Sequence, residues 1–132
     1  MTKTIALDTN VLLDYRLKRQ PGFNKTESLI ADCLSKKLQI FIPQIVFAEL
    51  EWVLRSYYKQ AKESIIEFLE ELLALDGVIV KDKAQVEQTL VLFKKENIKF
   101  TDATIFIQVK EFGPDEFLTF DEDLKKIYLE SY

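Results

Sequence analysis

Four short apolar runs, each separated from the next by longer helical stretches, constrain this chain more than any other feature. The runs are TIAL at 4–7, LQIFIP at 38–43, VIV at 78–80 and FLTF at 117–120. They do not alternate strictly between apolar and polar residues, which suits strands that are buried on both faces of a sheet. Strands that are separated by helices predict a parallel sheet covered on both faces, and therefore an α/β fold.

The stretches between these runs predict helices that are bounded by turn residues. Pro21 and Gly22 indicate a loop over 19–24, and Pro43 ends the second strand and suits the first position of a helix. The sequence shows no repeats and no long linker, so we expect a single domain over residues 1–132. The expected helices cover 9–18, 25–37, 44–58, 61–75, 83–97 and 102–112, and a last one begins near Asp121.

The composition is that of a folded domain rather than of a membrane or secreted protein. Apolar residues make up 48% of the chain and ten residues are Phe, which is enough to build a core. No apolar run approaches the roughly 20 residues of a membrane span. Asp8 and Asp14 interrupt any signal-peptide pattern, and the single cysteine, Cys33, has no partner for an internal disulfide. We therefore expect a cytoplasmic protein.

The chain contains no histidine and has a net charge of −4. The absence of histidine excludes Ser-His-Asp and Cys-His catalysis and zinc sites with histidine ligands. The acidic balance argues against a protein that coats nucleic acid with a basic face. It remains compatible with a nuclease whose acidic residues are neutralised by bound metal.

Two acidic residues directly follow apolar strands. Asp8 ends the first strand and Asp121 follows the fourth, so both should lie at the carboxyl-end rim of the sheet, where such folds bind ligands. The alternative for each is helix capping, because Asp is a favoured N-cap residue. A capping box from Thr119 to Glu122 is one form of this alternative.

Glu49 lies in a strongly apolar helix. Its neighbours at three and four positions are all apolar, which predicts that Glu49 points towards the core. Those neighbours are Ile45, Val46, Trp52 and Val53. Glu51, by contrast, is expected to form a surface ion pair with Arg55, four residues on. The alternative for Glu49 is a side chain that reaches water at the helix end.

Asp102 begins another helix, with capping by Thr101 or Asp102 as the alternative to a functional role. Gathering such acids is unfavourable, since one like-charge pair at about 4 Å costs about 4 kcal/mol at an effective dielectric near 20. A divalent cation would offset this cost, and ligands that are all oxygen favour Mg²⁺ or Mn²⁺. Such a site activates water and stabilises charge at a phosphoryl centre. The acids therefore indicate metal-dependent hydrolysis of phosphodiesters.

Four segments, LDTNVLLDY, AELEWVL, FTDATIF and LTFDEDL, occur in this order along the chain. No single segment is specific, but the ordered set resembles a PIN domain, and most closely the VapC-type toxin nucleases of toxin–antitoxin pairs. The resemblance covers essentially the whole chain. It implies a three-layer α/β/α sandwich with a central parallel sheet of four or five short strands.

The resemblance also implies a Mg²⁺- or Mn²⁺-dependent endoribonuclease that cuts single-stranded or looped RNA. The four acids of the family match Asp8, Glu49, Asp102 and Asp121. Asn10 and Thr119 match polar positions that orient carboxylates or water, and Asp123 is an alternative for the role of Asp121. The chain departs from many relatives in having Leu124 where they have an aromatic residue.

The partners implied by the resemblance are RNA and a small antitoxin that covers the active cleft. Trp52, Tyr57 and Tyr58, within the apolar residues 44–75, are candidates for the antitoxin surface or for a homodimer interface, with core packing as the alternative. Basic residues outside the acid pocket are candidates for binding RNA, with ordinary solvated surface charges as the alternative. They are Arg16, Lys18, Arg19 and Lys99.

Three other functions remain alternatives. A PIN-domain nuclease that processes or degrades RNA without an antitoxin keeps the fold and the chemistry. A catalytically inactive PIN-fold binding protein keeps the fold alone. A phospho-accepting receiver domain is disfavoured, because Asp8 has no adjacent acidic residue near the first strand.

Overall fold

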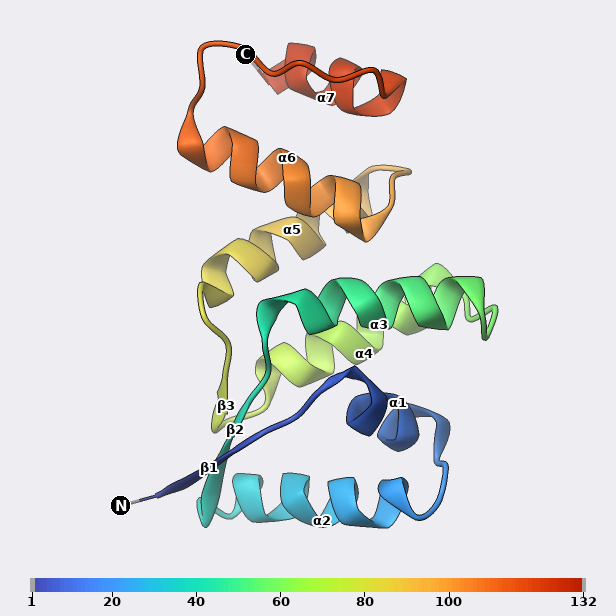
Figure 1. Ribbon diagram of the computed structural model, residues 1–132, viewed down its shortest axis with the longest axis vertical. Helices are drawn as coiled ribbons and strands as arrows, with labels where there is room; N and C mark the ends of the chain where they lie inside the picture. Colours follow the sequence, from blue (N-terminus) through green and yellow to red (C-terminus); the bar gives the residue numbers. More distant parts are fainter. Residues whose placement is uncertain (1, 132) are drawn as a thin grey trace. The chain divides into compact units, whose positions relative to one another are not determined.

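A parallel sheet of three short strands forms the centre of the first part of the chain (Figure 1). The strands are β1 (Lys3–Ala6), β2 (Leu38–Phe41) and β3 (Val78–Ile79), in the order β1-β2-β3. The register places Ile5 opposite Ile40 and Ile40 opposite Val78. The central residue of this row, Ile40, is only 1% exposed. The predicted α/β class with a parallel sheet is confirmed.

The computed structural model describes residues 2–131, which divide into two compact units. The first unit extends to Lys83 and the second begins at Ala84. No helix within the described residues is both long enough and apolar enough to cross a membrane. The helices are α1 (Thr9–Leu17), α2 (Gly22–Leu34), α3 (Gln44–Ser56), α4 (Lys62–Ala74), α5 (Lys83–Lys95), α6 (Phe100–Phe112) and α7 (Glu122–Ser131).

The core of the first unit forms where the apolar stripes of its helices meet one another and the sheet. Helix α1 packs against α2 and α3, and α3 packs against α4. Each helix contributes residues at the spacing of one helical face, which is how an amphipathic helix buries its apolar side. The side chains with no exposed surface are Leu12, Phe47, Leu50, Leu54, Ile65 and Leu69.

Two glycines are required by close approaches within the first unit. Gly77, in the turn between α4 and β3, has φ +91°, and a Cβ atom there would lie 2.8 Å from the Sγ of Cys33. Gly22 begins α2, so the loop predicted over 19–24 ends earlier than expected. A Cβ at Gly22 would overlap the side chain of Asp14. Only glycine fits such close contacts without a shift of the neighbours.

The second unit is a small helical cluster built from α5, α6 and α7. Helix α6 ends at Gly113, which adopts the left-handed conformation that commonly terminates helices. Leu92, Ile98, Phe117 and Tyr128 pack around a buried apolar centre. That centre consists of Phe106, Ile107, Leu124 and Ile127.

The prediction of four or five strands is wrong for the described residues, which contain three. Residues 117–120, predicted as a strand, have no strand partner. Phe117 packs its ring on Tyr128 at 5.4 Å between centroids, whereas Leu118 and Phe120 are 83% and 89% exposed. Apolar composition favours a strand only when a neighbouring backbone is there to pair with it.

Candidate functional site

Asp8 lies two residues beyond the end of β1 and caps the helix that follows. It is the N-cap residue of α1, and its Oδ1 accepts a hydrogen bond from the backbone N–H of Val11 at 3.1 Å. The capping role considered from the sequence is therefore present. It uses only one carboxylate oxygen, and no hydrogen bond within the described residues reaches Oδ2. Asp8 is exposed, so Oδ2 is available to a ligand.

Glu49 is brought to the beginning of α1 although it lies 40 residues from Thr9 in the sequence. The hydroxyl Oγ1 of Thr9 donates to Oε1 of Glu49 at 2.6 Å. Thr9 directly follows Asp8 in the sequence. The start of α1 therefore carries one predicted acid, Asp8, and contacts a second one, Glu49, through Thr9. Sequence reasoning missed Thr9. The available signal was a hydroxyl residue directly after the strand-end acid.

The predicted inward orientation of Glu49 and the predicted surface position of Glu51 are wrong, whereas the predicted ion pair between Glu51 and Arg55 is confirmed. Glu49 is exposed, whereas Glu51 is 1% exposed and its Oε2 lies 2.6 Å from the Nε of Arg55. The apolar neighbours used in the prediction include Ile45 and Trp52, which are themselves 65% and 58% exposed. The buried face of α3 runs instead through Val46, Phe47, Leu50, Glu51 and Leu54.

Asp121 caps α7 in the second unit, much as Asp8 caps α1 in the first. Its Oδ1 accepts from the backbone N–H of Leu124 at 2.9 Å, and its own N–H donates to Oγ1 of Thr119 at 3.1 Å. Thr119 thus contacts the main chain of Asp121. Leu124, the departure from the family pattern, fills the core of the second unit at 4% exposed.

Asp102 lies in the first turn of α6 and does not cap it, since the N-cap residue is Lys99 and no side chain caps this helix. Burial raises the pKa of the Asp102 carboxyl. The charges of Asp121 and Asp123 raise this pKa further, while the charge of Lys99 lowers it. The three carboxylates therefore interact within the second unit. Like-charge repulsion of this kind is relieved by a cation.

The structure thus places Glu49 against Thr9, the residue after Asp8, in the first unit. In the second unit it places Asp102 near enough to Asp121 and Asp123 for their charges to influence its pKa. Over residues 2–131, no group of three or more Cys, Asp or Glu side chains is arranged to hold a metal ion. The carboxylates of these acids offer only oxygen atoms as metal ligands, which suits Mg²⁺ or Mn²⁺. The donor chemistry and the repulsion around Asp102 both fit a divalent cation.

The basic residues predicted to grip RNA differ in how they are engaged. Arg16 donates from Nη2 to the carbonyl oxygen of Ser64 at 3.1 Å and lies over the ring of Phe68. Arg19 pairs with Asp14 at 2.9 Å and also contacts Tyr58.

Lys18 is exposed just beyond α1, and Asn10 is exposed in its first turn. Lys99 lies near enough to Asp102 to influence its pKa. Lys18 and Lys99 are therefore the more available cations of the predicted set, because the guanidinium groups of Arg16 and Arg19 already bind other parts of the first unit.

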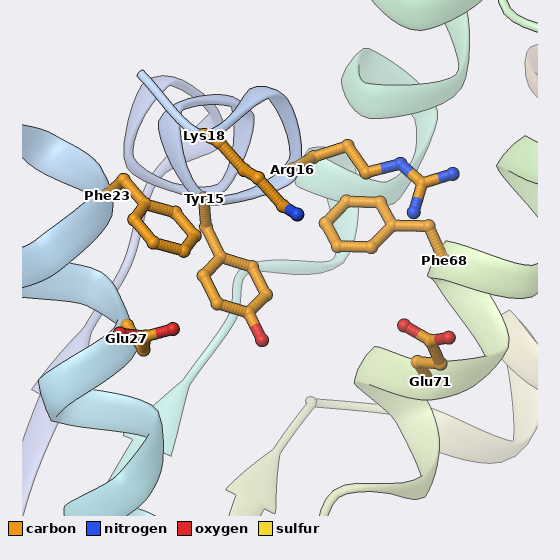
Figure 2. A pocket seen from close by; sticks show the side chains of 7 residues that line it. All are labelled: Tyr15, Arg16, Lys18, Phe23, Glu27, Phe68 and Glu71. Atoms are coloured by element: carbon orange, nitrogen blue, oxygen red, sulfur yellow. The ribbon is translucent and has the colours of Figure 1, made fainter. Parts of the chain in front are cut away.

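A pocket of about 270 Å³ lies between the end of α1, the start of α2 and α4 (Figure 2). The rings of Tyr15 and Phe23 stack at 5.8 Å in its wall, and cations and acids both line it. Tyr15 follows Thr9 by six residues of α1, which is about 9 Å of helix rise. Sequence reasoning did not single out this pocket, which lies away from Asp8. The remaining lining residues are Arg16, Lys18, Glu27, Phe68 and Glu71.

Comparisons with known proteins extend the resemblance seen in the sequence. The PIN domain family model matches residues 5–129, a span that includes all four predicted acids. A protein named VapC ribonuclease, from Aquifex aeolicus (strain VF5), is 28% identical over 121 residues, which cover 92% of this chain and 90% of the relative. The predicted PIN-like α/β fold is confirmed by the family match together with the parallel sheet. The chain therefore belongs to the PIN domain family.

Proposed function

We propose that this protein is a Mg²⁺- or Mn²⁺-dependent endoribonuclease that hydrolyses phosphodiester bonds of RNA. The observation that carries the proposal is the PIN domain match over residues 5–129, which begins before Asp8 and ends after Asp121. The relative named VapC ribonuclease supports the same activity.

The proposed metal ligands are Asp8, Glu49, Asp102 and Asp121, with Asp123 as the alternative to Asp121. A bound divalent ion would supply an activated water and stabilise the charge that develops on the phosphate. Asp8 and Asp121 each bond a helix-start N–H through one oxygen, which orients the other oxygen. The pKa of Asp102 is raised by burial and then by the charges of Asp121 and Asp123, and a bound cation would stabilise the charged form of this carboxyl.

Asn10 and Thr119 support these acids in the proposal, as groups that orient carboxylates or water. Thr119 already accepts a hydrogen bond from the N–H of Asp121. Lys18 and Lys99 are the proposed contacts to the RNA backbone, since phosphate binding relies on free cationic side chains. Arg16 and Arg19 would bind RNA only with guanidinium N–H groups that are not used by their present partners, the Ser64 carbonyl and Asp14.

A cognate antitoxin and a second copy of this chain are the proposed protein partners, and the cytoplasm is the proposed location. Trp52 and Tyr57 are 58% and 76% exposed, which supports an interaction surface on α3 and just beyond it. The name of the VapC relative favours the toxin function over RNA processing without an antitoxin.

The activity is tested with purified protein, a fluorescent single-stranded RNA, and Mg²⁺ or Mn²⁺, followed by EDTA. We expect cleavage with metal, none with EDTA, and recovery when Mn²⁺ is added back in excess. Asp8→Asn and Asp102→Asn should slow cleavage by about 100-fold or more. Asp115→Asn, at an exposed acid outside the proposed site, is the matched control and should cleave like wild type. Cleavage that persists in EDTA, or in both site variants, would contradict the proposal.

The toxin function is tested separately by induced expression in bacterial cells. We expect wild-type protein to arrest growth and Asp8→Asn to leave growth unaffected. Active nuclease in the test tube without growth arrest would favour the RNA-processing alternative.

A further inference from the structure

We propose that Thr9 is a positioning residue that holds the Glu49 carboxylate ready for metal binding. The inference rests on the proposed function, and it assigns a role to a residue that the sequence pattern did not single out. It starts from the hydrogen bond of 2.6 Å between Oγ1 of Thr9 and Oε1 of Glu49.

The direction of this bond follows from the chemistry of the two groups. An ionised carboxylate has no proton to donate, so the hydroxyl of Thr9 must donate to Glu49. Hydrogen bonds from a hydroxyl to a charged oxygen are shorter and stronger than those between neutral groups, and the observed distance lies in that range. The bond occupies Oε1, and no hydrogen bond within the described residues reaches Oε2 of Glu49.

Thr9 is a rigid anchor for a side chain that otherwise has little to hold it. It is the first residue of α1, directly after the capping residue Asp8, so its backbone is held by the helix start. Its β-branched side chain has few rotamers. Glu49 is exposed and has three rotatable side-chain bonds, and it gains a defined orientation from this contact. A flexible side chain that is already held in place loses less conformational entropy when it binds a metal ion.

The same contact links two of the proposed ligands. Asp8 is held through Val11 at the start of α1, and Glu49 is held through Thr9 one residue along the same helix. The start of α1 thereby fixes one acid from its own sequence and one from α3. Removal of the Thr9 hydroxyl should disturb Glu49 while the cap of Asp8 remains in place.

The test compares Mn²⁺ binding by isothermal titration with RNA cleavage kinetics in four variants of the full chain. Thr9→Val and Thr9→Ala remove the hydroxyl, and Thr9→Ser retains it. We expect both hydroxyl-free variants to bind Mn²⁺ about 10-fold more weakly. Their kcat should fall while KM for RNA stays within about twofold, and Thr9→Ser should approach wild type. Thr4→Val is the matched control, because the Thr4 hydroxyl contacts Gln39 at 3.5 Å, away from any proposed ligand.

A double variant separates an effect through Glu49 from a general loss of structure. If Thr9 acts through Glu49, adding Thr9→Val to Glu49→Ala should cause no further loss of Mn²⁺ affinity. Wild-type affinity in both hydroxyl-free variants, additive losses in the double variant, or failure of Thr9→Ser to restore binding would overturn the role of Thr9. A wild-type protein that neither binds Mn²⁺ nor cleaves RNA would overturn the proposed function as well, which distinguishes the two failures.

Discussion

The buried ion pair of α3 provides the sharpest test of how this fold is stabilised. Glu51 is 1% exposed and lies 2.6 Å from Arg55, whose side chain is 39% exposed. Arg55→Met keeps most of the apolar stem of the side chain and removes only the cation. The substitution therefore removes the cation that lies against a buried carboxylate, which should be strongly destabilising.

The magnitude follows from the exposure of the two side chains. Breaking a fully buried pair by removing one partner costs about 3–5 kcal/mol. Water reaches the Arg55 side of this pair, so we expect a smaller loss, about 2–3 kcal/mol in the free energy of unfolding. With a urea m-value of about 1.5–2 kcal/mol/M, the unfolding midpoint should fall by about 1–2 M.

The assay is urea unfolding followed by the fluorescence of Trp52, the one tryptophan of the chain, which lies next to Glu51. Replacing both partners, Glu51→Leu with Arg55→Met, should restore stability to within about 1 kcal/mol of wild type, because no buried charge remains. Arg19→Met is the control, since its pair with Asp14 is 43% and 33% exposed and should contribute less than about 1 kcal/mol. An Arg55→Met variant as stable as Arg19→Met, or a double variant less stable than Arg55→Met, would refute the reasoning.

Two further predictions concern the turn before β3 and the acid of α6. Gly77→Ala should destabilise the protein by at least about 1 kcal/mol in urea unfolding, because φ is +91° and the new Cβ meets Cys33 at 2.8 Å; an unchanged midpoint would contradict the strain. The pKa of Asp102 is raised in the folded protein above its ordinary value of 3.8. Its contribution to the stability of the fold is therefore fully present below pH 3.8 and is lost as the pH rises through the folded pKa. In EDTA, the Tm of Asp102→Asn relative to wild type should therefore increase from pH 3.5 to pH 7; a flat difference would be inconsistent with the raised pKa.

Sequence alone determined the local architecture of this protein to a large degree. The three strands and seven helices of the described residues coincide with predicted elements, within a few residues at their ends. The start of α1 after Asp8 could be predicted, because a cap and the helix it caps are neighbours in the chain. The ordered acidic segments were also sufficient to indicate the PIN family, which the family match over 5–129 confirmed.

Tertiary structure decided which side of each helix is buried and which distant residues meet. Which of Glu49 and Glu51 is buried could not be predicted from their sequence neighbours, because burial depends on which elements pack against α3 and not on apolar residues alone. Residues 117–120 have the composition of a strand, yet pairing needs a second backbone that local sequence does not specify. The contact of Thr9 with Glu49 spans 40 residues, so only the folding of α3 against α1 could bring a hydroxyl to that carboxylate.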